Sequence, residues 1–227
     1  MNISLIIFCY NESGNIRNVI NNALKIIPSI SSSYEILVVN DGSVDGTADI
    51  IDGLSESHES IKTIHHSKNL GIGMALLSGY KAAQKEYICA IPGDGQFDLE
   101  ELREVKPFTN NTYYSFYRPK TNYNLYRRIL TWLNRLYNQH ILGIYLRDVN
   151  WIKIYRKDQI DTVDPKLKSS LVESEICARL FKKGILPIEI PSKYLDREYG
   201  DAKGGSFNIL IKVIPETIEL FWAIHFR

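Results

Sequence analysis

Hydrophobic and polar positions alternate along the first half of the chain in blocks that predict strands and helices in turn. Short apolar runs predict four strands, over residues 3–10, 35–39, 61–65 and 87–91. After each strand, apolar residues recur at the spacing of an amphipathic helix, which predicts helices at residues 13–27, 47–54, 73–85 and 99–105. Strands that alternate with helices are joined by crossovers and lie parallel, so the pattern predicts an α/β sheet covered on both faces.

The second half of the chain continues this pattern with a longer helix. It predicts strands at 113–117, 151–155 and 185–190 and helices at 122–142 and 173–183. A polar, glycine-rich loop at 196–205 leads into an amphipathic tail at 207–226. Because no repeat or linker separates the two halves, we expect the second half to complete the fold of the first.

Polar clusters directly follow the predicted strands. They are Asn11-Glu12, Asn40-Asp41-Gly42-Ser43, Asn69 and Asp94-Gly95-Gln96. Ligands of open α/β sheets bind beyond the carboxyl ends of the strands, so we expect the chemistry there. Asp94 and Gln96 stand two residues apart in a turn and can direct two oxygen ligands at one divalent cation. An ordinary Asp-Gly turn explains the same residues, and both interpretations stay open at this point.

Composition narrows the class of protein. The chain has 227 residues, 44% of them hydrophobic and 23% charged, which excludes a disordered or fibrous protein. Its net charge of +1 argues against a general nucleic-acid binder. Through Tyr117 there are 8 basic against 14 acidic residues, and after it 19 against 12. The basic half suggests an anionic ligand or an anionic lipid surface, with solvated surface lysines as the alternative.

The cysteines and the apolar runs bear on the compartment. Cys9, Cys89 and Cys177 lie far apart in apolar contexts, which predicts buried free thiols in a reducing compartment. No run of about 18 apolar residues is present, so we expect no segment that crosses a bilayer. We therefore expect a cytoplasmic protein, either soluble or peripheral on the cytoplasmic face of the membrane.

Four motifs, in their order and spacing, resemble those of the family 2 glycosyltransferases. They are Tyr10-Asn11-Glu12, Asp41-Gly42-Ser43-Val44-Asp45-Gly46-Thr47, Asn69-Leu70-Gly71-Ile72-Gly73 and Asp94-Gly95-Gln96. Residues of the second half resemble the polyprenyl-phosphate sugar transferase branch of that family, typified by dolichyl-phosphate mannose synthase. These are Arg118, Asn134, Asp148-Val149-Asn150, Lys153-Ile154-Tyr155-Arg156, Glu175, Gly184, Pro191 and Arg197-Glu198-Tyr199-Gly200.

The resemblance covers roughly residues 3–205 and implies the GT-A fold, a mostly parallel sheet with helices on both faces. It implies one glycosyltransferase domain over 1–205, with a nucleotide-sugar-binding half at 1–117 and an acceptor-binding half at 118–205. Residues 206–227 then form a C-terminal amphipathic helical tail.

The same resemblance implies the roles of individual residues. The base and ribose of a nucleotide-sugar donor would contact Tyr10, Glu12 and Asp41, and Asp94 would bind the donor's diphosphate through Mg²⁺ or Mn²⁺, with Gln96 as a second metal ligand. Asp94, Arg118 and Arg197 would be catalytic. The acceptor would contact Arg118, Asn134, Arg197 and Lys203. Arginine suits this role because its planar fork binds phosphate oxygens bidentately.

Three positions depart from the family pattern. Phe8-Cys9 stands where a proline commonly precedes the tyrosine, Asn40 replaces the first aspartate of the Asp-Asp-Gly-Ser motif, and Pro92 replaces the first carboxylate of the Asp-x-Asp motif. The last change leaves one carboxylate for the metal, so the diphosphate would supply more of its coordination. A non-catalytic nucleotide-sugar-binding scaffold subunit is therefore one alternative.

The acceptor is the second open question. Relatives that act on a hydroxyl commonly place a base aspartate at a position that reads Ser174 here, and a phosphate acceptor needs no base. The sequence thus favours inverting transfer to a polyprenyl phosphate. Transfer to a hydroxyl in polysaccharide or secondary-metabolite assembly is the alternative, and it requires Glu173 or Glu175 as the base. The tail could lie on a membrane, or pack against the core, a second copy or a membrane partner subunit.

Overall fold

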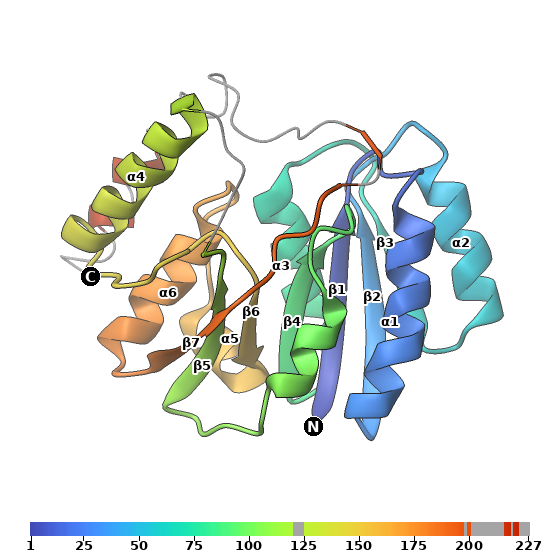
Figure 1. The fold of residues 1–227 in the computed structure, drawn as a ribbon, viewed down its shortest axis with the longest axis horizontal. Coiled ribbons are helices and arrows are strands. Elements are labelled where there is room, and N and C mark those ends of the chain that lie inside the picture. Colours follow the sequence, from blue (N-terminus) through green and yellow to red (C-terminus); the bar gives the residue numbers. More distant parts are fainter. Residues whose placement is uncertain (120–124, 198, 201–215, 219, 223–227) are drawn as a thin grey trace.

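A seven-stranded sheet forms the centre of the molecule in this computed structural model (Figure 1). The structure describes residues 1–119, 125–197, 199–200, 216–218 and 220–222. The strand order is β3-β2-β1-β4-β6-β5-β7. The strands are β1 (Asn2–Cys9), β2 (Ser33–Asn40), β3 (Ile61–His65), β4 (Tyr87–Pro92), β5 (Thr112–Tyr117), β6 (Lys153–Arg156) and β7 (Leu186–Pro191). Only β6 runs antiparallel to its neighbours in this sheet, so the carboxyl ends of the other strands share one edge.

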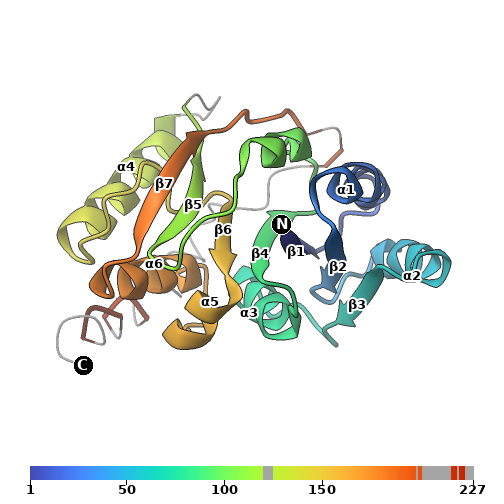
Figure 2. The ribbon, with the colours of Figure 1, turned by 90° about the horizontal axis from the view of Figure 1, so that it is seen from below.

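Helices cover both faces of the sheet (Figure 2). They are α1 (Ile16–Ile30), α2 (Thr47–Ser57), α3 (Ile72–Ala82), the 3-10 helix η1 (Leu99–Glu104), α4 (Leu125–His140), α5 (Lys157–Val163) and α6 (Val172–Lys182). Helix α1 and η1 lie over one face, and α3, α5 and α6 lie over the other. Helix α2 lies beside β3 at one end of the sheet, and α4 lies at the opposite end, above β5 and β7 in Figure 1.

The central strands are buried because both of their faces are covered. Five consecutive positions of β1 are buried, and so are the last six of β2, in agreement with their continuous apolar sequences. Helix α3 packs so closely on β1 that a Cβ added at Gly79 would lie 2.5 Å from a methyl carbon of Ile6. Glycine at this position therefore sets the distance between the helix and the strand.

The structure confirms the predicted α/β architecture, and the second half of the chain adds β5, β6 and β7 to the same sheet. Two elements differ from the prediction. The segment predicted as a helix at 99–105 is a six-residue 3-10 helix, capped by the Asp98 side chain on the backbone N–H of Glu100. Helix α5 was not predicted, because a mostly polar seven-residue segment carries too few apolar positions to show helical spacing.

The three cysteines are buried thiols, as the sequence predicted. None of the described helices is both long enough and apolar enough to span a membrane. Most of the predicted tail lies outside the described residues. Within its described part Leu220 is buried, Ile218 and Trp222 are exposed, and the Tyr137 hydroxyl of α4 donates a hydrogen bond to the carbonyl of Thr217.

A buried carboxylate ties the amino end of the sheet together. Glu35 of β2 accepts hydrogen bonds from the Ser4 hydroxyl (2.7 Å), the Gln84 backbone N–H (2.7 Å) and the Lys62 ammonium (2.8 Å). Burial acts to raise the pKa of Glu35, but these three donors outweigh it, and the pKa lies below its ordinary value. The interaction therefore contributes its full stability above the pKa of Glu35 in the unfolded chain, and this stability is lost as the pH falls from there through the lower pKa of the folded protein.

We expect Glu35→Gln to lower the free energy of unfolding at pH 7 by about 1–3 kcal/mol, because the charge-assisted hydrogen bonds are weakened. Urea unfolding at pH 7 and at pH 3 measures the effect, and the difference between variant and parent should shrink at pH 3. Glu56→Gln on the exposed surface of α2 is the matched control and should change neither value. A destabilisation equal at both pH values would contradict this account of Glu35.

Candidate active site

The predicted polar clusters gather at the carboxyl edge of the sheet. Strands β1, β2 and β4 are neighbours, and the register pairs Cys9 with Asn40 and Phe8 with Pro92. The segments that begin at Tyr10, Asp41 and Gly93 therefore leave the sheet side by side. Parallel pairing of adjacent strands is what brings together motifs that are distant in the sequence.

Hydrogen bonds between turns fix the first motif on the second. Asn11 adopts a left-handed backbone (φ 53°), which is uncommon for a non-glycine residue. Its backbone N–H donates to the Ser43 hydroxyl at 2.9 Å, and its side-chain oxygen accepts from the N–H of Val44 at 2.8 Å. The N–H of Glu12 donates to the Thr47 hydroxyl at 2.9 Å. These contacts set the direction in which the Glu12 side chain leaves the turn.

Asp41 organises the loop between β3 and α3. Its Oδ1 accepts the N–H of Leu70 (2.9 Å) and its Oδ2 that of Gly71 (2.8 Å). His66 Nδ1 lies 2.7 Å from Asp41 Oδ1, and His66 Nε2 lies 2.9 Å from the Ser78 hydroxyl. The sequence predicted that Asp41 contacts the nucleotide-sugar donor. In the structure Asp41 is buried, and its hydrogen bonds join the third motif to the second. Sequence reasoning did not assign His66 to this cluster, because a histidine pair at a strand end carries no specific signal.

Two predicted carboxylates meet one predicted arginine at this edge. Arg197 Nη2 lies 2.6 Å from Glu12 Oε1 and 3.4 Å from Asp94 Oδ2. Glu12 Oε2 accepts a hydrogen bond from the Asn15 side chain at 2.8 Å, and Asn15 also donates to the carbonyl of Tyr199. The loop that carries Arg197 is thus fastened to the start of α1, and Arg197 lies between Glu12 and Asp94.

Burial is the largest influence on the pKa of Asp94. It raises the pKa of Asp94 above its ordinary value, and the Gln96 backbone N–H (3.1 Å), Arg197 and Arg118 offset this only in part. The ion pair with Arg197 is longer than the 2.7–2.9 Å typical of a charge-assisted hydrogen bond. The carboxylate is therefore desolvated and only loosely paired within the protein.

Gln96 contacts the loop that carries Arg197. Its side-chain amide nitrogen donates to the carbonyl of Leu195 at 3.4 Å, which leaves its Oε1 as the atom able to bind a cation. Within the described part of the chain, no group of three or more His, Cys, Asp and Glu side chains is placed to hold a metal ion. The two residues that the sequence predicted as metal ligands, Asp94 and Gln96, supply one carboxylate and one amide oxygen.

Arg118 is held rigidly at the end of β5. Its Nε and Nη2 donate to the two carboxylate oxygens of Asp148 at 2.7 and 3.1 Å. Its guanidinium carbon lies 4.3 Å from the centre of the Trp151 ring and 5.3 Å from that of Tyr194. Sequence reasoning did not identify the aromatic contacts of Trp151 and Tyr194, because they depend on strand pairing in the second half.

The remaining predicted residues are Tyr10, Asn134 and Lys203. The Asn134 carbonyl and side-chain oxygens both accept hydrogen bonds from the Asn138 side chain within α4. Tyr10 follows β1 at the carboxyl edge. Lys203 lies outside the described residues.

The two candidate bases are engaged inside the protein. The Glu173 carboxylate accepts from the hydroxyls of Tyr80 and Tyr155 and pairs with Lys153. Glu175 accepts the N–H groups of Lys166 and Leu167 and pairs with Arg179. Every oxygen of the two carboxylates therefore has a partner, and both side chains are buried.

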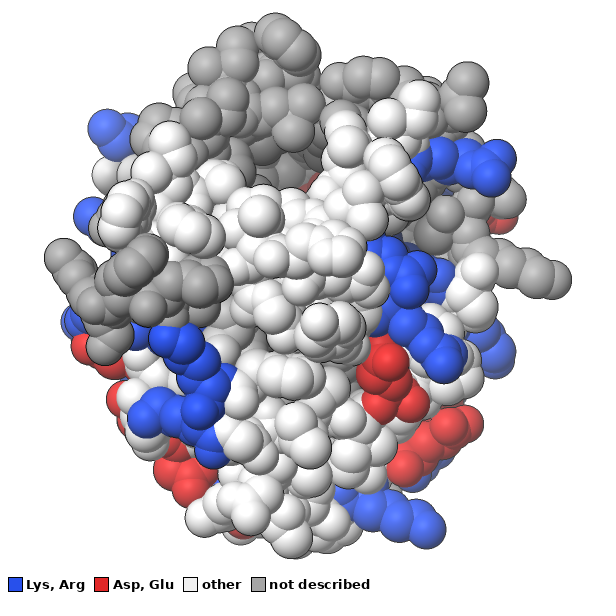
Figure 3. Space-filling model, turned by 90° about the vertical axis from the view of Figure 1, so that its left-hand side faces the viewer, with Lys and Arg blue, Asp and Glu red and all other residues white. Residues whose placement is uncertain are grey.

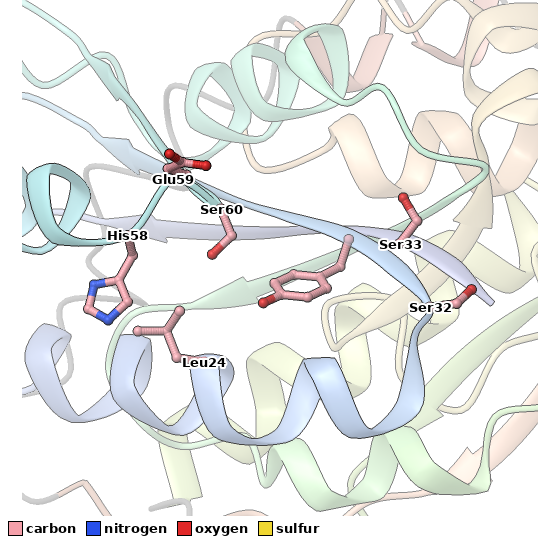
Figure 4. Close-up of a pocket in the computed structure, with 7 residues that line it drawn as sticks. Leu24, Ser32, Ser33, His58, Glu59 and Ser60 are labelled. Atoms are coloured by element: carbon pink, nitrogen blue, oxygen red, sulfur yellow. The ribbon is translucent and has the colours of Figure 1, made fainter.

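A shallow open cavity of about 660 Å³ lies at the other edge of the sheet (Figure 4). Its lining comes from α1, the start of β2 and the turn before β3, and Leu24 of α1 lies next to His58. It stands at the amino ends of β2 and β3 and is separate from the cluster around Asp94.

Comparison with known proteins places these observations in a family. Residues 4–166 match the family model described as glycosyl transferase family 2. The chain is 26% identical over 220 residues to an undecaprenyl-phosphate 4-deoxy-4-formamido-L-arabinose transferase of Salmonella choleraesuis, covering 95% of this chain and 66% of that protein. It is 26% identical over 220 residues to a polyprenol monophosphomannose synthase of Mycolicibacterium smegmatis, covering 90% and 82%. The chain thus spans just under two thirds of the first relative's length.

Solved structures show the same fold. The glucosyl-3-phosphoglycerate synthase of Mycobacterium tuberculosis, in complex with Mn²⁺, uridine diphosphate and phosphoglyceric acid, superposes with a TM-score of 0.67 at 13% identity over 98% of this chain and 78% of that one. A mannosyltransferase of Pyrobaculum calidifontis in complex with GDP-Man and Mn²⁺ gives a TM-score of 0.58 at 15% identity over 84% and 55%. The α/β sheet is therefore a GT-A fold, as the motifs predicted. The chain belongs to glycosyl transferase family 2.

Proposed function

We propose that the chain transfers a sugar, with inversion, from a nucleotide diphosphate donor to a polyprenyl phosphate. The similarity to an undecaprenyl-phosphate sugar transferase and a polyprenol monophosphomannose synthase supports a polyprenyl phosphate acceptor. The observation that carries the proposal is the pairing of one loosely held carboxylate, Asp94, with Arg197 and Arg118 at the carboxyl edge, while Glu173 and Glu175 are both engaged elsewhere. This set of charges suits phosphate groups on both substrates, and neither of the two candidate bases is available to a hydroxyl.

The reaction follows from these positions. An oxygen of the acceptor phosphate attacks the anomeric carbon of the sugar, and the bond from that carbon to the donor diphosphate breaks on the opposite side. The acceptor oxygen is already ionised at neutral pH, so no proton has to be removed. Arg118, oriented by Asp148 and Trp151, binds the acceptor phosphate, and Arg197 lies where it can stabilise the negative charge of the leaving nucleoside diphosphate.

Mg²⁺ or Mn²⁺ is the cofactor of this proposal. Asp94 and the side-chain oxygen of Gln96 would hold it, and the diphosphate would complete its coordination. The ion would neutralise charge on the departing diphosphate. The fit rests on Asp94, because a desolvated carboxylate that is only loosely paired with Arg197 gains most from a cation.

Transfer assays test the function. Purified protein with Mn²⁺ is incubated with UDP-, GDP- and dTDP-sugars, with or without a short polyprenyl phosphate, and released nucleoside diphosphate is measured. Release that requires the lipid phosphate is the expected result. Release that requires a sugar alcohol instead would establish the hydroxyl-directed alternative, and donor binding without turnover in any mixture would establish a non-catalytic binding subunit.

A peripheral membrane contact also belongs to this proposal, because a polyprenyl phosphate resides in a bilayer. Helix α4 exposes Ile129, Trp132 and Leu133 on one face, with Arg128 and Arg135 exposed on the same helix. Figure 3 looks onto this end of the molecule and shows a broad uncharged area with both basic and acidic groups at its margins. An apolar stripe beside arginines suits the surface of an anionic membrane.

We expect Trp132→Glu to weaken binding to vesicles of equal parts phosphatidylglycerol and phosphatidylcholine by about tenfold or more, since an amphipathic ring at the interface is replaced by a charge. Co-sedimentation measures the binding. Trp132 is 59% exposed, so the fold should be unaffected. Val44→Glu, at an 85% exposed residue between β2 and α2, is the control and should bind as the parent does. Equal binding by all three proteins would refute the role of α4.

A further inference from the structure

A buried lysine lies at the centre of the second half of the molecule. Lys153, the first residue of β6, has a side chain that is 1% exposed, and its Nζ lies 3.1 Å from Glu173 Oε2. The same ammonium donates to the carbonyl of Val149 and, at 3.1 Å, to that of Trp151. Its three N–H donors thus have three acceptors.

The partner carboxylate is itself fixed from two sides. Glu173 Oε1 accepts from the Tyr80 hydroxyl of α3 at 2.5 Å, and Oε2 accepts from the Tyr155 hydroxyl of β6 at 2.8 Å. Burial disfavours the charge of Lys153, but the Glu173 carboxylate outweighs it and raises the pKa of Lys153 above its ordinary value. The ammonium is therefore a charged, immobile group anchored on α6, α3 and β6.

The two carbonyls that Lys153 fixes belong to the turn that holds Arg118. Val149 follows Asp148, whose carboxylate binds the Arg118 guanidinium through both oxygens. Trp151 packs its ring against the same guanidinium at 4.3 Å. Lys153 thus binds the backbone of Val149, which is next to Asp148, and the backbone of Trp151 itself.

The energetics favour a geometric role over a stabilising one. A buried ion pair loses the hydration of both charges, and its replacement by uncharged residues is often neutral for stability. Uncharged residues could not replace the three hydrogen bonds that converge on the Nζ atom of Lys153. Such a point fixes the conformation of the 148–151 turn.

We propose that Lys153, anchored on Glu173, is a positioning residue for Arg118: it fixes the turn whose Asp148 and Trp151 orient the guanidinium toward an acceptor phosphate. The part played by the acceptor rests on the proposed function, whereas the orientation of Arg118 does not. Lys153 and Glu173 themselves contact neither substrate in this proposal.

The test uses the full chain with both charges removed together, as Lys153→Met/Glu173→Gln, so that neither charge is left buried alone and the tyrosines keep an amide partner. We expect the KM for a short polyprenyl phosphate to rise by about 10-fold to 10²-fold, since a small misplacement of a substrate-binding group has effects of this size. The Kd of nucleoside diphosphate with Mn²⁺ should stay within twofold of the parent. A merely structural role would change both constants.

A spectroscopic readout is independent of the acceptor. The Nε–H of Arg118 donates to Asp148 at 2.7 Å, so its ¹⁵N–¹H resonance, assigned by its loss in Arg118→Lys, should be present in the parent protein and exchange with water slowly. It should exchange faster in the double variant. Asp148→Asn, which weakens the same contact directly, should reproduce both the higher acceptor KM and the faster exchange.

The outcomes separate the two proposals. If the parent protein uses no polyprenyl phosphate, the proposed function fails, and the Arg118 resonance alone decides the role of Lys153. An unchanged Arg118 resonance in the folded double variant overturns the role of Lys153. If the double variant does not fold, Lys153→Arg takes its place, because it keeps the charge and displaces the N–H donors. The same two measurements apply to it, and an unchanged Arg118 resonance would again overturn the role of Lys153.

Discussion

Replacing Asp94 with asparagine should lower kcat for sugar transfer by roughly 10²–10³-fold or more, because the site loses its one carboxylate for the metal. The structure gives a reason why this loss should occur without damage to the fold. Burial raises the pKa of Asp94, so its charge is a cost to the folded protein that an amide avoids. The backbone N–H of Gln96 can still donate to the remaining side-chain oxygen.

Three measurements test the Asp94→Asn variant. Nucleoside diphosphate release gives kcat, titration with Mn²⁺ gives the metal dependence, and thermal unfolding gives the stability. Asp98→Asn is the matched control, since Asp98 caps η1 a few residues away and should leave kcat and its metal dependence unchanged. Normal turnover by Asp94→Asn at the same Mn²⁺ concentration would remove Asp94 from the site.

Replacing Arg197 with alanine should have two effects of opposite sign. Transfer should fall by roughly 10²-fold or more, because the departing diphosphate loses a fixed positive charge. Binding of Mn²⁺ in the absence of donor should become tighter, because Arg197 lies 3.4 Å from Asp94 Oδ2 and repels a cation there. A residue that acted only by holding the loop to Glu12 would not increase metal affinity.

Calorimetry with Mn²⁺ alone and the transfer assay measure the two effects. Arg197→Lys keeps the charge but not the fork, so it should retain the weak metal binding of the parent and recover only part of the transfer rate. Lys193→Ala, at an exposed residue of the same segment, is the control and should change neither. Weaker Mn²⁺ binding by Arg197→Ala would contradict the electrostatic account.

Local motifs in the sequence predicted single residues of the site but not their contacts with one another. Asp94, Glu12 and Arg197 were predicted one by one from motifs. Their meeting point could not be, because Glu12 and Arg197 are 185 residues apart and join only when the loop after β7 crosses to the start of α1. The roles of His66, Trp151 and Lys153 depend on partners that no local pattern reveals.

The same division runs through the fold. The sequence by itself determined the strands of the parallel core and the polar segments after them. A strand covered on both faces must be continuously apolar, and the residues that bind ligands come directly after such strands. Only the tertiary structure decided that β6 inserts antiparallel between β4 and β5, and that Glu173 and Glu175 turn inward to partners of their own. Strand order and the pairing of buried charges depend on which distant segments pack together, and that is a property of the whole chain.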